Sequence, residues 1–361
     1  MFLLALVILF AGLSILETSA NSYVYAIGPE QTGTQRLNFA QSFNPFGAIA
    51  GVVLSQVFVL SQLSTLSAEE RNALPPAELV LIQGSELNAV TKTYMGLGLV
   101  MVAILVAIYF TRMPRVKEED KGVDLKGTFR RLLRNRNYIW GVVAQFFYVG
   151  AQIAVWSFII RYAMQQLRLD AIVAGLGKEA APGEIISTLR NTEPLAAGFY
   201  RVTEFLGFKA FLPRTAEQAG ATYYILSLVL FVIGRFTFTG LMNFIKPRVL
   251  LLLLSLVAFI CSLLTIYGNG VYGIYALVGI SGCMSLMFPT IYGLGIAGLG
   301  DDTKIGGAGM IMAIAGAAVL TQVQGIVSDQ SGSIRSAYWV PAVAFLVIAF
   351  YAAVFRKRQV Q

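Results

Sequence analysis

The chain contains no histidine and only two cysteines among its 361 residues. Without histidine there is no imidazole to exchange a proton near neutral pH or to bind a metal, so any proton chemistry must use carboxylates. Cys261 and Cys283 fall inside apolar segments and lack the spacing of a disulfide framework or a metal site. The sequence therefore predicts no metal centre, no cofactor and no catalytic cluster, and argues against an enzyme.

Charged residues are also scarce. They make up 13% of the chain, against 57% hydrophobic residues and a mean hydropathy of +0.70. These values are typical of proteins that cross a membrane several times. The net charge of +8 does not indicate a nucleic-acid partner, because the basic residues lie in a few loops rather than on a soluble domain. The expected surroundings are a lipid bilayer.

Windows of about 20 apolar residues predict nine membrane helices in an all-α protein. Three basic clusters, in 112–137, at Lys246 with Arg248, and at 356–358, fall on one side of the membrane if nine spans are correct. The positive-inside rule makes that side cytoplasmic. We therefore expect the C-terminus inside the cell and Met1 outside. The predicted spans are 2–27, 37–62, 91–111, 138–163, 220–243, 248–267, 270–297, 305–327 and 337–355.

Polar segments divide the predicted spans. Residues 112–137 are expected to be a cytoplasmic basic linker between a three-span unit, 1–111, and a six-helix bundle, 138–361. Segment 63–89 contains a Pro-Pro pair and predicts a short external helix. Segment 165–219 is much longer than a typical connection and carries apolar patches, so we expect it to fold over the external face.

Two charges stand inside apolar helices. A charge at the centre of a membrane helix costs at least ~2.5–3.5 kcal/mol, and withdrawal from water favours the protonated form of a carboxyl group. Glu17 is therefore expected to take up and release protons, with a neutral or paired structural role as the alternative. For Arg235 we expect a structural charge that binds carbonyls or an acid of a neighbouring helix, with gating as the alternative.

The second predicted span carries several amides. Gln41 and Asn44 lie three residues apart on one helical face, and Asn38 lies one turn before Gln41. Amides both donate and accept hydrogen bonds, which suits sugar hydroxyls, although hydrogen bonds between helices would use the same groups. Pro45 and Gly47 follow, so a kink is expected there.

The fourth predicted span repeats this pattern. Gln145, Tyr148 and Gln152 fall at i, i+3 and i+7, and Trp156 lies four residues further along. An aromatic ring stacks on the apolar face of a pyranose while amides bind its hydroxyls. This stripe favours a cavity wall, with ordinary core packing as the alternative for Trp156.

Five segments together resemble one known family. They are "LETSANSYVYAIGPE", "TQRLNFAQSFNPFG", "AQFFYVGAQIAVWSFIIRYA", "IGRFTFTGLM" and the stretch from "FPTIYGLGIAGLGDDTKIGG" to "QSGSI". These segments are similar to the fucose:proton symporter family, the fucose/galactose/glucose branch of the major facilitator superfamily. The resemblance covers nearly every predicted span and fails only in 165–219.

The resemblance implies twelve helices in two six-helix bundles, with the sugar site between them and alternating access by rocking. The nine helices here correspond to the fourth to twelfth, so the chain is expected to be N-terminally truncated. By position, Glu17 resembles the family's proton-coupling carboxylate, and Gln41 and Asn44 resemble its sugar-contacting amides.

The family's aromatic cavity lining corresponds to Trp156, Phe231 and Phe288. Two positions depart from the family pattern. Phe288 stands where a tyrosine is common, which removes one hydroxyl from the expected sugar site. Ser22 replaces a usual proline. The identity of the sugar is therefore open at this stage.

The sequence thus predicts a bacterial inner-membrane importer of a monosaccharide, L-fucose or a related hexose, by proton symport. Sodium in place of the proton stays open. The alternatives are a glucose/galactose importer of the same family and a truncated membrane remnant that does not transport.

Overall fold

The computed structural model describes residues 2–58, 74–112, 114, 125–169, 194–205 and 216–354. Within these ranges the regular structure is entirely helical. The chain divides into two compact units. Met1–Ser42 with Glu118–Gln361 forms the first, and Phe43–Lys117 forms the second.

Eight helical segments of the described residues are long and apolar enough to cross a membrane, and they correspond to eight of the nine predicted spans. The remaining predicted span, 37–62, is not one continuous helix. The eight segments are Val7–Ala26, Pro76–Phe110, Arg136–Leu167, Ala219–Leu241, Pro247–Tyr267, Val271–Ile296, Gly300–Ser331 and Ser336–Val354.

The span 37–62 is divided between two helices. α2 (Gly33–Gln41) ends before a turn at residues 42–43, and α3 (Asn44–Phe58) begins after it. Pro45 is the second residue of α3, where its missing N–H costs nothing, whereas inside a continuous helix it would remove a hydrogen bond. The interruption expected near Pro45 is therefore present, just ahead of the proline.

The second unit contains α3 and α5 (Pro76–Phe110). α5 has 35 residues, which corresponds to a length of about 50 Å, well beyond the ~30 Å hydrocarbon core. The expectation of a separate short helix in 63–89 is wrong from residue 76 onward, because Pro76 starts a helix that runs on into the span. Residues 59–73 lie outside the described ranges. The apolar side chains of α5 are largely exposed, as a lipid-facing helix requires.

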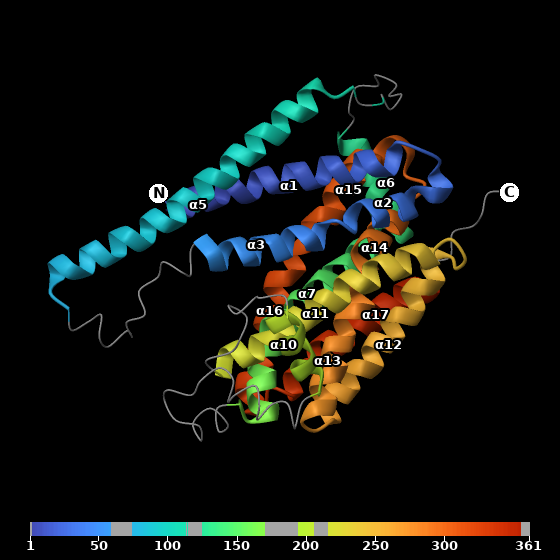
Figure 1. Ribbon diagram of the computed structural model, residues 1–361. Helices are drawn as coiled ribbons and strands as arrows, with labels where there is room; N and C mark the ends of the chain where they lie inside the picture. The colour runs from blue at the N-terminus through green and yellow to red at the C-terminus, as the bar shows by residue number, and fades with distance from the viewer. Residues whose placement is uncertain are drawn as a thin grey trace. The chain divides into compact units, whose positions relative to one another are not determined.

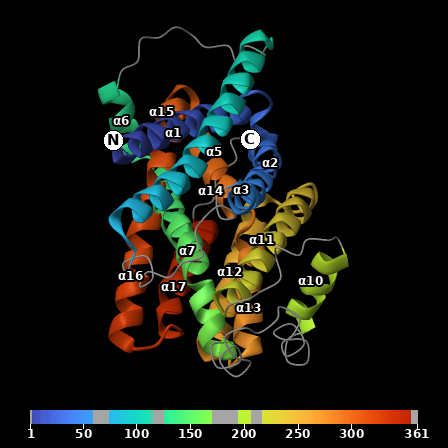
Figure 2. The ribbon, with the colours of Figure 1, turned by 60° about the vertical axis from the view of Figure 1, so that its left-hand side comes forward.

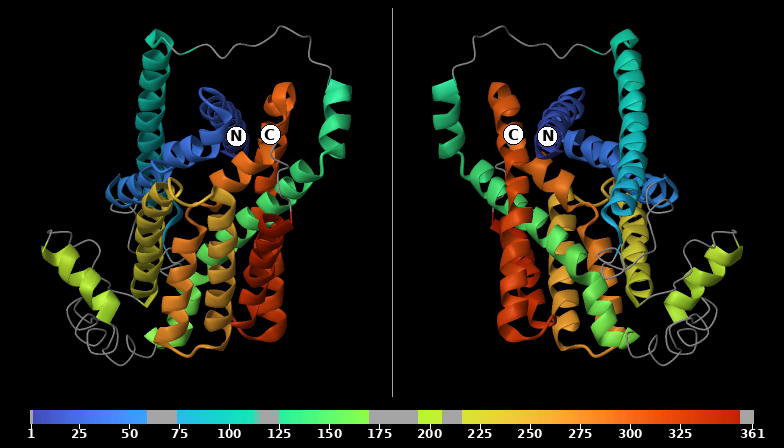
Figure 3. Two further views of the ribbon diagram at one scale, coloured as in Figure 1. Left: turned by 90° about the vertical axis from the view of Figure 1, so that its right-hand side faces the viewer. Right: turned by 90° about the vertical axis from the view of Figure 1, so that its left-hand side faces the viewer.

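The first unit is a bundle built around α7 (Arg136–Leu167), which contacts α11, α13, α14, α16 and α17. The helices of the bundle lie side by side in Figure 2. The two side views show the green α7 passing obliquely across the orange and red helices (Figure 3). The other members are α11 (Ala216–Leu241), α12 (Pro247–Tyr267), α13 (Val271–Met284), α14 (Met287–Ile296), α15 (Thr303–Met312), α16 (Gly316–Ser331) and α17 (Trp339–Val354).

Two of these spans are interrupted. α13 and α14 are separated at residues 285–286, shortly before Pro289, and α15 joins α16 through a 3₁₀ turn, Ala313–Ala315. Interrupted helices are tolerated at membrane depth only where protein or water satisfies the freed backbone groups. α1 (Phe2–Ala26) packs on α15 and α2, and α2 packs on α14 and α11 (Figure 1).

Close packing in the bundle depends on glycine. A Cβ added at Gly316 would collide with the carbonyl oxygen of Phe146, and one added at Gly150 would collide with Leu320. α7 and α16 therefore approach backbone to backbone, as small residues permit in membrane bundles. Large side chains fill the rest of the core, and the fully buried ones include Tyr148, Tyr162, Tyr223, Tyr292, Tyr338 and Phe345.

Two connecting segments contain helices of their own. α6 (Leu125–Arg134) lies inside the predicted linker 112–137. The long segment 165–219 includes the end of α7 and the start of α11, and between them the structure describes a further helix, α10 (Pro194–Phe205). The hydroxyl of Tyr200 in α10 hydrogen-bonds Thr222 in α11 at 2.6 Å. Burial raises the pKa of Tyr200 to about 12, so this hydroxyl stays protonated. α10 is thus anchored on the bundle.

Candidate functional site

A short line of polar side chains runs between α1 and α2. Glu17 is half-buried in α1, and Asn21, one turn later, is buried. Nε2 of Gln41 in α2 donates to Oδ1 of Asn21 at 2.7 Å. Among the described residues, Nδ2 of Asn21 has no hydrogen-bond partner, so one donor stays available to a ligand. The geometry thus places Gln41 of α2 against Asn21 of α1, one helical turn after Glu17.

The next residue of α1 contacts α14 and α15. Oγ of Ser22 lies 3.1 Å from the hydroxyl oxygen of the fully buried Tyr292, and Glu17 is within electrostatic reach of the same hydroxyl. Gly307 of α15 covers this pair. A Cβ there would stand 2.5 Å from the Tyr292 oxygen and 2.7 Å from Oγ of Ser22. Ser22, which departs from the family pattern, therefore takes part in a contact between helices.

Asn38 faces α14 as well. It is fully buried, and its Nδ2 donates to the carbonyl oxygen of Thr34 at 2.9 Å and to Oγ1 of Thr290 at 3.1 Å. These bonds connect α2 to α14. For Asn38 the geometry therefore supports the alternative role of these amides, which is hydrogen bonding between helices.

A pocket of about 370 Å³ lies between α2 and α11. At its edge Nε2 of Gln35 donates to Oδ1 of Asn243 at 2.7 Å. Arg36, Phe39, Phe236, Thr239 and Gly240 complete its lining. The pocket and the amide pair mark where α2 meets the end of α11.

The amide stripe of α7 is directed into the bundle. Gln145 is fully buried, and among the described residues neither its Oε1 nor its Nε2 has a hydrogen-bond partner. Gln152, two turns later, is half-buried. Between them the hydroxyl of Tyr148 donates to the carbonyl oxygen of Met284 at 3.0 Å. Burying an amide without hydrogen-bond partners costs free energy unless a ligand or water satisfies it. Both polar atoms of the Gln145 amide are therefore available to such a partner.

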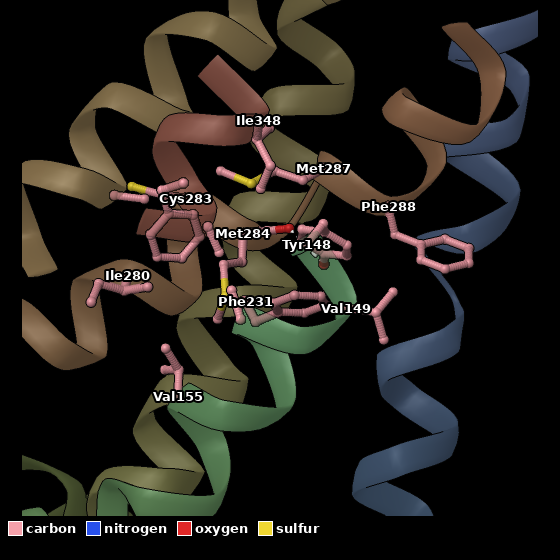
Figure 4. Packing of buried hydrophobic residues seen from close by; sticks show 14 of the residues in the cluster. Tyr148, Val149, Val155, Phe231, Ile280, Cys283, Met284, Met287, Phe288 and Ile348 are labelled. Carbon is pink, nitrogen blue, oxygen red and sulfur yellow. Dashed lines mark hydrogen bonds between the residues drawn. The ribbon is translucent and has the colours of Figure 1, made fainter. Parts of the chain in front are cut away.

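Aromatic rings gather beside this stripe. Trp156 and Phe231 meet edge to face with ring centroids 5.2 Å apart, and Nε1 of Trp156 donates to Oγ of Ser281 at 3.1 Å. Tyr148 and Phe288 have ring centroids 6.3 Å apart. Tyr148, Phe231 and Phe288 come from three helices, α7, α11 and α14, to one region of the bundle (Figure 4). The three predicted aromatic residues are thus linked through α7.

Arg235 is the buried charge of α11. Its guanidinium carbon lies 5.2 Å from the ring centroid of Phe231, within the range of a cation–π interaction. Tyr148 is within electrostatic reach. Among the described residues, Nε and Nη1 of Arg235 have no hydrogen-bond partner. The charge therefore faces the aromatic cluster, and two of its nitrogens are without the carbonyl or carboxylate expected from the sequence.

Asn44 is the remaining predicted site residue. It is the first residue of α3 and is exposed there. It belongs to the second unit, whereas Gln41 belongs to the first.

Comparison with known proteins places these features in a family. No family model matches the chain. It is 35% identical to the L-fucose-proton symporter of Haemophilus influenzae, over 97% of the chain and 73% of that protein. It is 35% identical to the Escherichia coli L-fucose-proton symporter, over 98% and 71%. A glucose/galactose transporter of Brucella abortus is 27% identical, over 99% and 72%.

Solved structures agree. A crystal structure of the E. coli fucose:proton symporter matches with a TM-score of 0.76 at 33% identity, covering 95% of this chain and 73% of that one. A structure of a major facilitator superfamily transporter, FucP, in the outward conformation matches with a TM-score of 0.77 at the same identity and coverage. The chain belongs to the L-fucose–proton symporter family of the major facilitator superfamily.

Membership of the symporter family confirms the resemblance drawn from the sequence, and with it the all-helical membrane fold. It also confirms a transporter rather than an enzyme. A multi-pass protein of the bacterial inner membrane follows from the apolar helices and from these relatives.

Sequence reasoning missed two residues in this region of the symporter. Asn21 lies one turn after Glu17, and that spacing alone could have singled it out. Tyr292 lies in the "FPTIYG" segment four residues after Phe288, and its contact with Ser22 could be found only once α1 and α14 were placed together.

Proposed function

We propose that the chain imports a monosaccharide, L-fucose or a related hexose, together with a proton, by alternating access. Membership of the symporter family supports this function. The observation that assigns this function to particular residues is the hydrogen bond between Gln41 and Asn21. Asn21 lies one helical turn from Glu17. This hydrogen bond places an amide suited to sugar hydroxyls against a residue that lies one helical turn from a carboxyl group suited to proton exchange.

Glu17 is the proton carrier in this proposal. An ionised carboxylate costs several kcal/mol inside the membrane, whereas the neutral acid is far cheaper. The loaded bundle therefore closes and rocks with Glu17 protonated. Access to the cytoplasm then allows the proton to leave. Tyr292, whose hydroxyl lies within electrostatic reach, is placed to respond to the charge of Glu17.

The sugar is held by amides and an aromatic wall. Gln145 and Gln152 of α7 offer donors and acceptors, and Gln145 has none of them engaged among the described residues. Gln41 and Asn44 are the further amides proposed to bind the sugar. The rings of Trp156, Phe231 and Phe288 are suited to the apolar face of a pyranose.

Arg235 is proposed as a fixed charge at the base of this wall. Its position over Phe231 orients the ring, and its two unengaged nitrogens can bind a group that arrives when the bundles close. That arrangement is compatible with a gating role as well as with a structural one.

The proposed architecture has nine membrane helices, which correspond to the fourth to twelfth of the superfamily fold. Residues 1–111 form the second half of the N-terminal bundle, 112–137 the cytoplasmic linker and 138–361 the C-terminal six-helix bundle. The distribution of basic residues supports a cytoplasmic C-terminus.

Uptake by the full chain in proteoliposomes tests the proposal. Radiolabelled L-fucose should accumulate above its external concentration when a proton gradient is imposed. Glu17→Gln should abolish uphill accumulation and retain exchange of sugar across the membrane. With a permanently neutral side chain at residue 17 the bundles can still rock, but no proton is carried. Glu78→Gln, a change of the same kind at an exposed residue of α5, is the matched control.

Uphill uptake that survives in Glu17→Gln would remove Glu17 from the coupling step. Accumulation driven by a sodium gradient alone would replace the proton as the coupling ion.

A second candidate substrate is glucose or galactose. The similarity to the Brucella abortus glucose/galactose transporter supports it, as does Phe288, which removes a hydroxyl where the family commonly has tyrosine. A competition panel of L-fucose, galactose and glucose against labelled L-fucose distinguishes the two. Stronger competition by glucose or galactose than by L-fucose itself would favour this second substrate class.

A further inference from the structure

α6 is held on the bundle by one of its faces. Arg131 binds the carboxylate of Asp302 through two nitrogens, with Nε to Oδ2 at 2.8 Å and Nη2 to Oδ1 at 2.7 Å. Oγ1 of Thr128 donates to Oδ1 of Asp302 at 2.8 Å, and Leu132 is buried beside it. This arrangement fixes the rotation of α6 about its own axis, because a bidentate ion pair is directional.

The second face of α6 is apolar and exposed. Leu125, Phe129 and Leu133 recur every four residues and are 65%, 61% and 57% exposed. At 100° per residue they form one stripe along the whole helix. Three large apolar side chains in a row on a ten-residue helix are more than the scattered exposure that a protein surface normally shows.

The third face is basic. Lys126, Arg130 and Arg134 also recur every four residues and are exposed, and each directly follows a residue of the apolar stripe. Within the described part of the chain, no salt bridge is formed by these three side chains. The apolar and basic stripes therefore run side by side, opposite the face that binds Asp302.

The position of α6 determines what these two stripes meet. α6 ends at Arg134, and the membrane helix α7 begins at Arg136. A helix that ends two residues before a span lies at the membrane surface. An apolar stripe flanked by lysine and arginine is the pattern of a helix lying in the headgroup layer, with its apolar side chains among the acyl chains.

We propose that α6 is a binding surface for anionic phospholipid headgroups, with Leu125, Phe129 and Leu133 inserted in the bilayer and Lys126, Arg130 and Arg134 on the phosphates. The chemistry selects an acidic bilayer surface over a soluble partner. A protein groove would cover the apolar stripe, whereas the adjacent charges require a layer of negative groups along the full length of the helix.

Lipid binding to the purified full chain tests the basic stripe. Phosphatidylglycerol is titrated into detergent micelles containing the protein, and its affinity is read from the rise in melting temperature, since a ligand of the folded state stabilises it. Arg130→Gln with Arg134→Gln should weaken the affinity roughly 25-fold, because each basic residue near a headgroup layer contributes about fivefold. Arg168→Gln with Arg201→Gln removes two exposed charges elsewhere and should leave the affinity unchanged.

Spin labelling tests the apolar stripe. In a background without Cys261 and Cys283, a nitroxide at Phe129→Cys should be more accessible to oxygen than to a water-soluble nickel chelate in nanodiscs made of equal parts phosphatidylcholine and phosphatidylglycerol. A nitroxide at Arg130→Cys should show the reverse. This measurement stands even if the charge variants unfold in detergent.

Three results would overturn the proposal. The first is equal weakening by the two arginine pairs, and the second is equal stabilisation by phosphatidylcholine. The third is a nitroxide at residue 129 that is accessible to the water-soluble chelate, or that is buried against a second copy of the chain. Size-exclusion chromatography with light scattering detects such a second copy as an increase in mass.

Discussion

Asn21 carries a buried amide in which only the oxygen is hydrogen-bonded among the described residues. The oxygen accepts from Gln41, and among the described residues the nitrogen has no partner. A buried donor without a partner costs free energy unless a ligand satisfies it. In the proposed mechanism Asn21 therefore holds Gln41 in position and donates a hydrogen bond to the sugar.

Asn21→Ala should raise KM for sugar uptake roughly tenfold, the value of one buried hydrogen bond. The maximal rate should change little, because Glu17 is untouched. Initial rates of uptake in proteoliposomes over a range of sugar concentrations measure both. Asn88→Ala removes the same side chain from an exposed position of α5 and should leave KM unchanged. A lower maximal rate with normal KM in Asn21→Ala would assign Asn21 a structural role only.

The polar residues of the site could be identified from the sequence, whereas their hydrogen-bond partners could not. Glu17, Gln41 and Gln145 are conspicuous because polar groups are rare in apolar spans, and the structure places all three in the interior or half-buried. Their partners depend on how helices are rotated against one another. The bonds from Gln41 to Asn21 and from Asn38 to Thr290 could not be inferred from spacing along the chain.

The contact between α1, α14 and α15 illustrates how elements fit together. Gly307 allows α15 to lie directly over Tyr292 and Ser22. A Cβ at residue 307 would stand within 3 Å of both oxygens, so at least one of them would have to move. The packing of three helices therefore depends on the absence of one methyl group.

Gly307→Ala should destabilise the protein by about 1–3 kcal/mol, the usual cost of overpacking a well-filled site. Thermal unfolding in detergent measures the effect. Gly325→Ala is the control, because a Cβ there meets nothing within 4 Å. Adding Tyr292→Phe to Gly307→Ala should restore part of the stability by removing the colliding oxygen. Equal melting temperatures for Gly307→Ala and Gly325→Ala would contradict this account.

Elements were predictable where apolarity alone defines them. Eight of the nine predicted spans correspond to membrane-length helices, because about 20 apolar residues leave little choice in a bilayer. The start of α5 was missed. The Pro-Pro pair suggested a break and a separate external helix, whereas Pro76 starts a helix that runs on into the span. α6 was hidden in a segment that composition marks only as charged.

At the scale of the molecule, alternating access requires that α2 and α11 separate. The amide pair Gln35–Asn243 and the 370 Å³ pocket beside it lie where these helices meet. In the proposed architecture α2 and α11 belong to different bundles, and we therefore expect this contact to break when the bundles rock apart at that side.

Gln35→Cys with Asn243→Cys, in a background without Cys261 and Cys283, should lose transport when a short cleavable dithiol reagent joins the two residues. Reduction should restore uptake, and each single cysteine variant treated in the same way is the control. Radiolabelled sugar uptake before and after reduction is the measurement. Full transport with the cross-link in place, verified by mass spectrometry, would show that α2 and α11 do not separate here.

The class of the whole molecule could be predicted from composition, since a hydropathy of +0.70 leaves only membrane folds. The arrangement of its helices could not, because apolar faces in lipid carry little information about their neighbours. That information came from motif resemblance, and the fold match to the fucose:proton symporter confirms it.

The ion pair between Arg131 and Asp302 also constrains how the protein is made. The two residues are separated by 171 positions in the chain. At a synthesis rate of ~5–20 residues per second, about 10 to 35 seconds pass between the appearance of α6 and that of its acidic partner. During biogenesis α6 therefore emerges beside the membrane without its anchor, and the ion pair can fix its orientation only after Asp302, which directly precedes α15, has been translated.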